Sequence, residues 1–165
     1  MPPPPPEFTY RHRVTYAECT VGDHIYHSRY LDVLEAARGE FLRHLGHPVR
    51  QLQNDGFIFP VIEACLRYHR PARYDDLLHT RLELSELSAL RLGVLHTVRR
   101  EDGTLILEAE TRHVCTTPGE KPRRMPPDLL QALRPWLRPP EASEPTRYEA
   151  SPTVSGVQPP NEPPA

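Results

Sequence analysis

Proline divides this chain into three parts. Of its 21 prolines, five form the run at positions 2–6 and twelve lie between positions 122 and 164, so only four remain in between. Proline fixes φ and lacks a backbone N–H, and segments with few large apolar side chains bury too little surface to offset the entropy of ordering. We therefore predict disordered tails over residues 1–6 and 139–165, and one folded domain over residues 7–138.

Charge, hydropathy and cysteine content exclude several classes of protein. The 20 basic and 22 acidic side chains are interspersed and leave a net charge of −2, which argues against a nucleic-acid binder. No apolar stretch approaches the ~18 residues of a membrane span, and no basic segment followed by an apolar one opens the chain. The three cysteines are odd in number and are not spaced as zinc ligands. These features predict a cytoplasmic protein with free thiols and no membrane span.

The first half of the domain combines one strand with one long helix. Residues 8–19 alternate between apolar and polar side chains, which is typical of a strand. Apolar residues then recur at helical spacing over residues 29–45 and predict a mostly enclosed helix, capped by Ser28 and ended by Gly46. Gly39 lies inside this helix and costs up to ~1 kcal/mol, which suggests that another backbone or a ligand comes close.

The second half contains four further strand candidates, over residues 61–70, 77–87, 90–100 and 104–117. Their connections are short, so the sheet is predicted to be antiparallel, with about five strands and the long helix across a single face. A helix of ~17 residues is about 26 Å long, and strands of ~10 residues span about 33 Å. The sequence therefore predicts an α+β domain in which a sheet wraps around one helix.

Two motifs carry a resemblance to a known family. The segment YAECTVGDHIYHSRYLDVLEAAR (residues 16–38) and the turn RPARYDDL (residues 70–77) resemble motifs of the 4-hydroxybenzoyl-CoA thioesterase-like family of hotdog-fold proteins. The resemblance implies a hotdog fold that hydrolyses an acyl-CoA thioester to the free acid and coenzyme A without a cofactor. It also implies a homodimer or homotetramer with active sites between subunits.

The same resemblance implies an altered catalytic position. The family has an aspartate-x-aspartate pattern followed by a glycine turn, and its second aspartate is the catalytic carboxylate. In this chain the two aspartates fall on Glu18 and Thr20, and the glycine falls on Asp23. The usual catalytic carboxylate is therefore replaced by a threonine.

Thioester hydrolysis needs a base or nucleophile and hydrogen-bond donors for the developing oxyanion. The first N–H groups of the helix, at His27 and Ser28, are expected donors. The carboxylate is expected from Asp23 or Glu18, although a turn aspartate can equally bond its own backbone. His27 is the alternative base. Thr20 either positions a water or packs the turn.

Two other site chemistries are weaker. Cys19 could be a nucleophile by position, but no paired base is evident, so a buried thiol is the better interpretation. His24 and His27 have a spacing that suits a metal, but no third ligand accompanies them, so no metal site is predicted.

Substrate contacts are expected along the helix and the segment before the next strand. Glu35 and Arg38 match the family's glutamate-x-x-arginine and are assigned to the active-site wall, with a surface ion pair as the alternative. Core packing explains most of the remaining candidates for an acyl pocket equally well. These candidates are Tyr16, Tyr26, Tyr30, Phe57, Phe59 and Val61.

The main functional hypothesis is therefore an acyl-CoA thioesterase. A hotdog protein that binds an acyl-CoA or acyl carrier without hydrolysis is the alternative, motivated by Thr20. A hydratase or dehydratase of the same fold is a third and weaker hypothesis, because it requires an aspartate–histidine pair that is not recognisable here.

Overall fold

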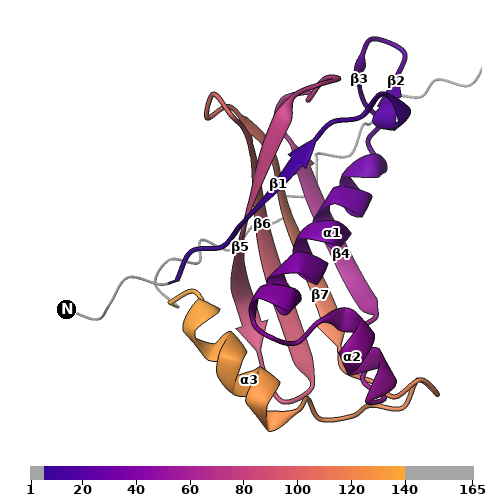
Figure 1. The fold of residues 1–165 in the computed structure, drawn as a ribbon, viewed down its shortest axis with the longest axis vertical. Helices are drawn as coiled ribbons and strands as arrows, with labels where there is room; N and C mark the ends of the chain where they lie inside the picture. Colours follow the sequence, from indigo (N-terminus) through magenta and orange to yellow (C-terminus); the bar gives the residue numbers. More distant parts are fainter. Residues whose placement is uncertain (1–5, 140–165) are drawn as a thin grey trace, which may run out of the picture.

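An antiparallel sheet with one long helix across a single face forms the body of the molecule (Figure 1). The computed structural model describes residues 6–139, so most of the two predicted tails, residues 1–5 and 140–165, lies outside the described residues. This is the predicted α+β hotdog arrangement. In spatial order the strands are β1 (Thr9–Arg13), β5 (Leu77–Leu87), β6 (Arg91–Arg100), β7 (Leu105–Val114) and β4 (Val61–Tyr68).

Alternation of side chains decides which face of the sheet meets the helix. On β5, Leu78, Leu82 and Leu84 are buried, whereas Arg81 and Ser85, at alternate positions, are exposed. The register carries the same face across the neighbouring strand, where Leu84 lies opposite Val94. Because side chains of a strand alternate with period two, one buried face follows directly from this pattern.

The first strand is shorter than predicted, because side chains of the next segment bond to the backbone and turn the chain. Glu18 accepts hydrogen bonds from the backbone N–H and the hydroxyl of Thr15, at 2.6 and 2.8 Å, and so caps a short 3-10 helix (Tyr16–Glu18). The apolar alternation continues through this segment, so pattern alone extends the strand too far. A small hairpin of β2 (Cys19–Thr20) and β3 (His24–Ile25) follows.

Helix α1 (Arg29–His44) begins where predicted, but two expectations about it were wrong. Ser28 has helical φ and ψ and makes no side-chain cap bond. The helix is not enclosed, because Leu31 and Glu35 lie on an exposed face. Of the two alternatives for Gly39, a close backbone is excluded, because an added Cβ would meet nothing within 4 Å among the described residues, whereas a close ligand stays a prediction.

Two short helices were not predicted. Helix α2 (Val49–Asn54) follows the end of α1 and buries Leu52, and α3 (Pro127–Leu133) lies against the sheet near the carboxyl end of α1 (Figure 1). A further 3-10 turn (Arg134–Trp136) places the Trp136 ring 4.8 Å from that of Phe41, measured between centroids. No helix within residues 6–139 is both long and apolar enough to cross a membrane.

Polar side chains divide the buried face of the sheet into two hydrophobic clusters. One cluster surrounds Phe41, Leu84 and Trp136, and the other surrounds Leu34 and Val98. Between them lies a band of buried polar residues on the three central strands, which we call the polar belt. The polar belt consists of Thr80, His96, Thr111 and His113.

Candidate functional site

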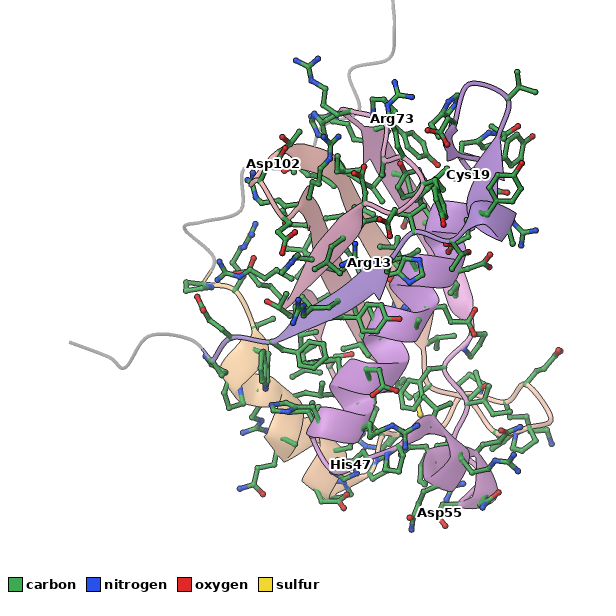
Figure 2. The ribbon with its side chains drawn as sticks, turned by 45° about the horizontal axis from the view of Figure 1, so that its top comes forward. Arg13, Cys19, His47, Asp55, Arg73 and Asp102 are labelled. Carbon is green, nitrogen blue, oxygen red and sulfur yellow. The ribbon has the colours of Figure 1, made fainter. Side chains whose placement is uncertain are left out.

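The second sequence motif holds the first in place at the amino end of α1. The Ile25 N–H donates to the carbonyl of Ala72 at 2.9 Å, and the N–H of Ala72 donates to the hydroxyl of Tyr30 at 3.2 Å. The Arg73 guanidinium donates to the Gly22 carbonyl at 3.0 Å. Figure 2 shows Arg73 and Cys19 at this same end of the molecule. The two motifs, ~50 residues apart, therefore build one local structure.

Two backbone N–H groups at the start of α1 are free to bind a ligand. Among the described residues no group accepts from the N–H of His27 or of Ser28. The hydroxyl of Tyr68, on β4, donates to the His27 carbonyl at 2.9 Å and fixes this peptide beside the sheet edge. Free N–H groups at a helix amino end attract negative charge, so this position can stabilise an oxyanion.

The structure gives the two candidate carboxylates different surroundings. Both oxygens of Glu18 are occupied, because Oε1 lies 2.8 Å from Nε2 of His12 and Oε2 accepts the two bonds from Thr15. Asp23 is exposed, has φ +56°, and makes no side-chain hydrogen bond among the described residues. This left-handed φ accounts for the glycine that the family pattern places at this position.

The other predicted residues of this loop lie close to the same end of α1. Thr20 is exposed and lies opposite His24 in the β2–β3 hairpin. Cys19 is half-buried rather than fully buried. Desolvation, together with the negative charges of Asp23 and Glu18, raises the pKa of its thiol, which disfavours the nucleophilic thiolate.

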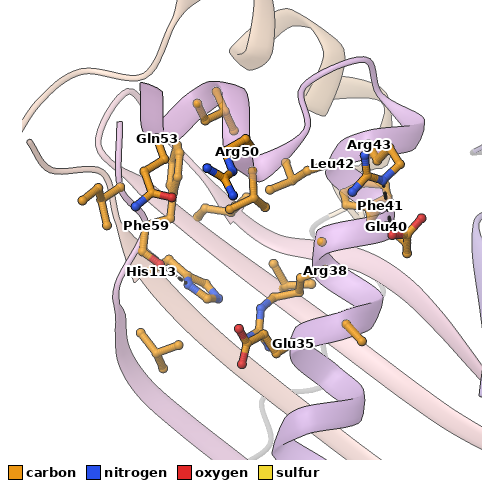
Figure 3. Close-up of a pocket in the computed structure, with 18 of the residues that line it drawn as sticks. Glu35, Arg38, Glu40, Phe41, Leu42, Arg43, Arg50, Gln53, Phe59 and His113 are labelled. Carbon is orange, nitrogen blue, oxygen red and sulfur yellow. Dashed lines mark hydrogen bonds and ion pairs between the residues drawn. The ribbon is translucent and has the colours of Figure 1, made fainter. Parts of the chain in front are cut away.

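A cavity of about 930 Å³ lies further along α1, between this helix, α2 and the segment that precedes β4 (Figure 3). Of the predicted substrate contacts, Glu35, Arg38, Phe59 and Val61 line it, together with Phe57. The others lie outside it. Tyr16 is 81% exposed and packs edge-on against Tyr74, Tyr30 is buried in the core, and Tyr26 and Ser28 are exposed.

Burial changes the protonation of the groups at the inner wall of the cavity. It lowers the pKa of Arg38, an effect that the neighbouring Glu35 carboxylate partly offsets. It also lowers the pKa of His113 to about 4 and that of His96 to about 3, and the positive charge of Arg38 adds to both shifts. Both imidazoles are therefore neutral near pH 7, and Arg38 carries the positive charge of this wall.

Sequence reasoning missed the two histidines, although a signal for them was present. His113 lines the cavity, with Nδ1 3.1 Å from the Phe59 carbonyl and Nε2 3.0 Å from the Thr111 hydroxyl. A neutral His113 donates from Nδ1 to the carbonyl, and its Nε2 accepts from Thr111. His96 shares the period-two face of Val94 and Val98, which marks it as buried from sequence alone.

Comparison with known proteins agrees with this architecture. The thioesterase-like superfamily model matches residues 14–133. The acyl-CoA thioester hydrolase YbgC of Escherichia coli is 32% identical over 74% of this chain and 92% of its own. The 1,4-dihydroxy-2-naphthoyl-CoA hydrolase of Thermosynechococcus vestitus is 30% identical over 86% of this chain and 97% of its own.

A solved structure gives the same result at the level of the fold. The hypothetical protein TT1821 of Thermus thermophilus is 38% identical and superimposes with a TM-score of 0.73, covering 78% of this chain and 98% of its own. The family model spans the sheet from β5 to β4, α1 and the loop that precedes it, which are the elements that build the site. The chain belongs to the thioesterase-like superfamily of hotdog-fold proteins.

Proposed function

We propose that this thioesterase hydrolyses acyl-CoA thioesters at the amino end of α1, with the acyl group in the cavity along the helix. Hydrolysis of a thioester follows from membership of the superfamily and from relatives named acyl-CoA thioester hydrolase. The observation that supports the position is the pair of free N–H groups at His27 and Ser28, which the Tyr68 hydroxyl bond holds beside β4. Such donors stabilise the oxyanion as it forms.

Asp23 is the proposed carboxylate. Its side chain leaves the loop that precedes α1 and makes no hydrogen bond to another described residue, whereas both oxygens of Glu18 are held by Thr15 and His12. A carboxylate here would deprotonate the attacking water while the N–H groups receive the oxyanion. We propose that Thr20 hydrogen-bonds this water, because a hydroxyl orients a water but is not basic.

Hydrolysis of one medium-chain and one aromatic acyl-CoA by matched variants tests this assignment. Asp23→Asn should lower kcat by about 10²-fold or more with little change in KM. Asparagine tolerates a positive φ as aspartate does, so the loop is preserved. Asp75→Asn is the matched control, because Asp75 is also an exposed turn aspartate with positive φ, at +68°.

Three further variants separate the alternatives. Glu18→Gln and His27→Ala should reduce kcat less than Asp23→Asn, and Thr20→Asp should raise it by restoring the family's carboxylate. Wild-type turnover that survives Asp23→Asn, Glu18→Gln and His27→Ala would contradict the placement of the site in this loop. Saturable binding without turnover in the wild type would instead favour the non-hydrolytic acyl-CoA or acyl-carrier binder.

We further propose that two copies pair through β4 to form a homodimer. This strand is an edge of the sheet, and Val61, Ile62 and Tyr68 on it are each about half exposed. An edge strand with exposed apolar side chains is a template for pairing with another strand. Val61 and Phe59 also line the cavity, so a second copy at this edge would border the acyl group.

Sedimentation measurements test the dimer. Ile62→Lys should convert the protein to a monomer at micromolar concentration, whereas Leu90→Lys, at an exposed apolar residue in the β5–β6 turn, should not. A wild-type monomer would refute the proposal, and a tetramer would require a second interface.

Three free cysteines, one of them exposed, support a reducing cytoplasmic location.

A further inference from the structure

Arg38 is a charged group of the cavity wall that carries a buried and unpartnered atom. Its Nη1 is fully buried and has no hydrogen-bond partner among the described residues. Within residues 6–139 no carboxylate lies within ion-pair distance of it, although Glu35 is one turn away on the same helix. Burying a guanidinium without a partner is costly, so the site is suited to a ligand that brings an acceptor.

The charges that line the cavity balance in number, but ion pairing leaves two arginines and one acid without a partner among the described residues. Six charged side chains line it, and among these Glu40 and Arg43 form an ion pair at 3.3 Å. Asp32 is paired with Arg29, which lies outside the lining, also at 3.3 Å. The remaining three are Glu35, Arg38 and Arg50.

The unpaired acid and the two unpaired arginines differ in their exposure. Glu35 is exposed, so water screens its charge, whereas one arm of Arg38 is buried. Figure 3 shows Arg50, on α2, turned toward the same cavity from the opposite side. Arg50 is exposed like Glu35, so water screens both of these opposite charges, and a ligand anion inside the cavity would meet Arg38 as the one partly buried unpaired charge.

Much of the rest of the wall is apolar, although Tyr10, Gln53 and His113 also line it. Phe57, Ile58, Phe59, Leu92 and Val94 line the cavity beside Arg38. Such a wall suits a hydrocarbon segment. Its one buried cation suits a single anionic group at the end of that segment.

We propose that the acyl group ends in a carboxylate, which Arg38 binds inside the cavity. This inference rests on the proposed function, because it takes the thioester to lie at the amino end of α1. The carboxylate of a dicarboxylic acyl thioester would accept a charge-assisted hydrogen bond from the Arg38 guanidinium, which lines the cavity, and Arg50 would add a weaker attraction from the facing wall. Arg38 is in this sense a specificity-determining residue.

The helix sets the length of the preferred chain. Arg38 follows Ser28 by ten residues, a distance of about 15 Å along an α-helix. Figure 3 shows the Arg38 side chain pointing back toward Glu35. An extended chain advances about 1.2 Å per bond, so an arginine side chain that lies along the helix axis would span about 7 Å of this distance. The remaining ~8 Å corresponds to about seven bonds, which is the span of an eight-carbon dicarboxylic acid.

Comparison of suberyl-CoA with octanoyl-CoA tests the proposal, because the two differ only in a terminal carboxylate or methyl. We expect the wild type to prefer suberyl-CoA in kcat/KM by about tenfold or more, as a charge-assisted hydrogen bond provides. Arg38→Met should abolish this preference, Arg38→Lys should retain part of it, and Glu35→Gln should increase it. Arg11→Met is the control for loss of one positive charge outside the cavity, and it should leave the ratio unchanged.

Thioesters of pantetheine distinguish the carboxylate from the phosphates of coenzyme A. If Arg38 binds the acyl carboxylate, the preference for suberyl over octanoyl persists in the pantetheine series. If Arg38 binds a coenzyme A phosphate, Arg38→Met weakens both CoA thioesters equally and leaves both pantetheine thioesters unchanged, which would overturn the proposal. Equal or better turnover of octanoyl-CoA by the wild type would also overturn it.

Binding of thioether analogues, which cannot be hydrolysed, separates this proposal from the proposed function. If neither thioester is hydrolysed, thioesterase activity fails on these substrates, and calorimetric titration with the suberyl and octanoyl thioethers still decides the specificity. Tighter binding of the suberyl analogue, lost in Arg38→Met, supports the role of Arg38. Equal affinity for both analogues refutes it.

Discussion

Acidification from pH 8 to pH 5 should destabilise the protein through two buried histidines. Burial lowers the pKa of His113 to about 4 and that of His96 to about 3, from an ordinary value of 6.5. Below pH 6.5 the unfolded chain takes up protons at these positions while the folded chain does not, so stability rises with pH across this range. The stabilisation is fully present above pH 6.5 and is lost as the pH falls toward 4.

The free energy of unfolding lost at pH 5 depends little on the pKa values of His96 and His113 in the folded state, because both lie below that pH. Each histidine then contributes a loss of about 2 kcal/mol relative to pH 8, or about 4 kcal/mol for the pair. This is a large part of the roughly 5–15 kcal/mol that stabilises a typical domain. Urea unfolding followed by circular dichroism at pH 8, 7, 6 and 5 measures it directly.

Variants isolate the contribution of each histidine. His96→Gln and His113→Asn should each remove about half of the loss between pH 8 and pH 5, and the double variant should remove nearly all of it. Asparagine at position 113 keeps a donor for the Phe59 carbonyl. Other groups titrate equally in the wild type and in the variants. The contribution of each histidine is therefore the difference between the wild type and its variant in the free energy of unfolding lost between pH 8 and pH 5. The reasoning would be refuted if the variants lost as much stability as the wild type between pH 8 and pH 5.

Three further outcomes follow from local geometry. Gly93→Ala should destabilise the domain by about 1–3 kcal/mol, because a Cβ there would collide with the Ser85 hydroxyl and Glu86, where β5 bulges; urea unfolding at pH 8 checks this. Trp136→Ala should cost about 3 kcal/mol or more through the lost contact with Phe41, measured in the same way. Tyr68→Phe removes the bond to the His27 carbonyl and should lower kcat by a few-fold while leaving the melting temperature within a few degrees.

The regular elements were predictable because their signals are local. The period-two pattern placed the third strand at residues 77–87, which is where β5 lies, and the helical period placed α1 to within one residue. Helix α2 was not predictable in this way, because six residues are too few to establish a period. Helix α2 buries Leu52 in the core, and the local sequence does not show this tertiary contact.

The candidate site was predictable only in part, because it depends on how distant segments meet. The loop before α1 was identified through its motif, and the capping-box spacing of Thr15 and Glu18 is also readable from the sequence. The contact of Glu18 with His12 and the free side chain of Asp23 depend on the fold. Arg38 was placed at the wall by resemblance. Its lack of a partner among the described residues depends on the inner face of the sheet, which only the fold brings beneath the helix.

The division of the core by the polar belt has a consequence for how the molecule moves. Leu34 packs in one hydrophobic cluster and Phe41 in the other, so α1 rests on the sheet at two separate areas, with Arg38 between them. Two separate contact areas would allow α1 to tilt about Arg38, because tighter packing over one area would offset looser packing over the other. Rocking of this kind would widen the cavity at one end of α1 and narrow it at the other, and would couple the room for a ligand to the tilt of the helix.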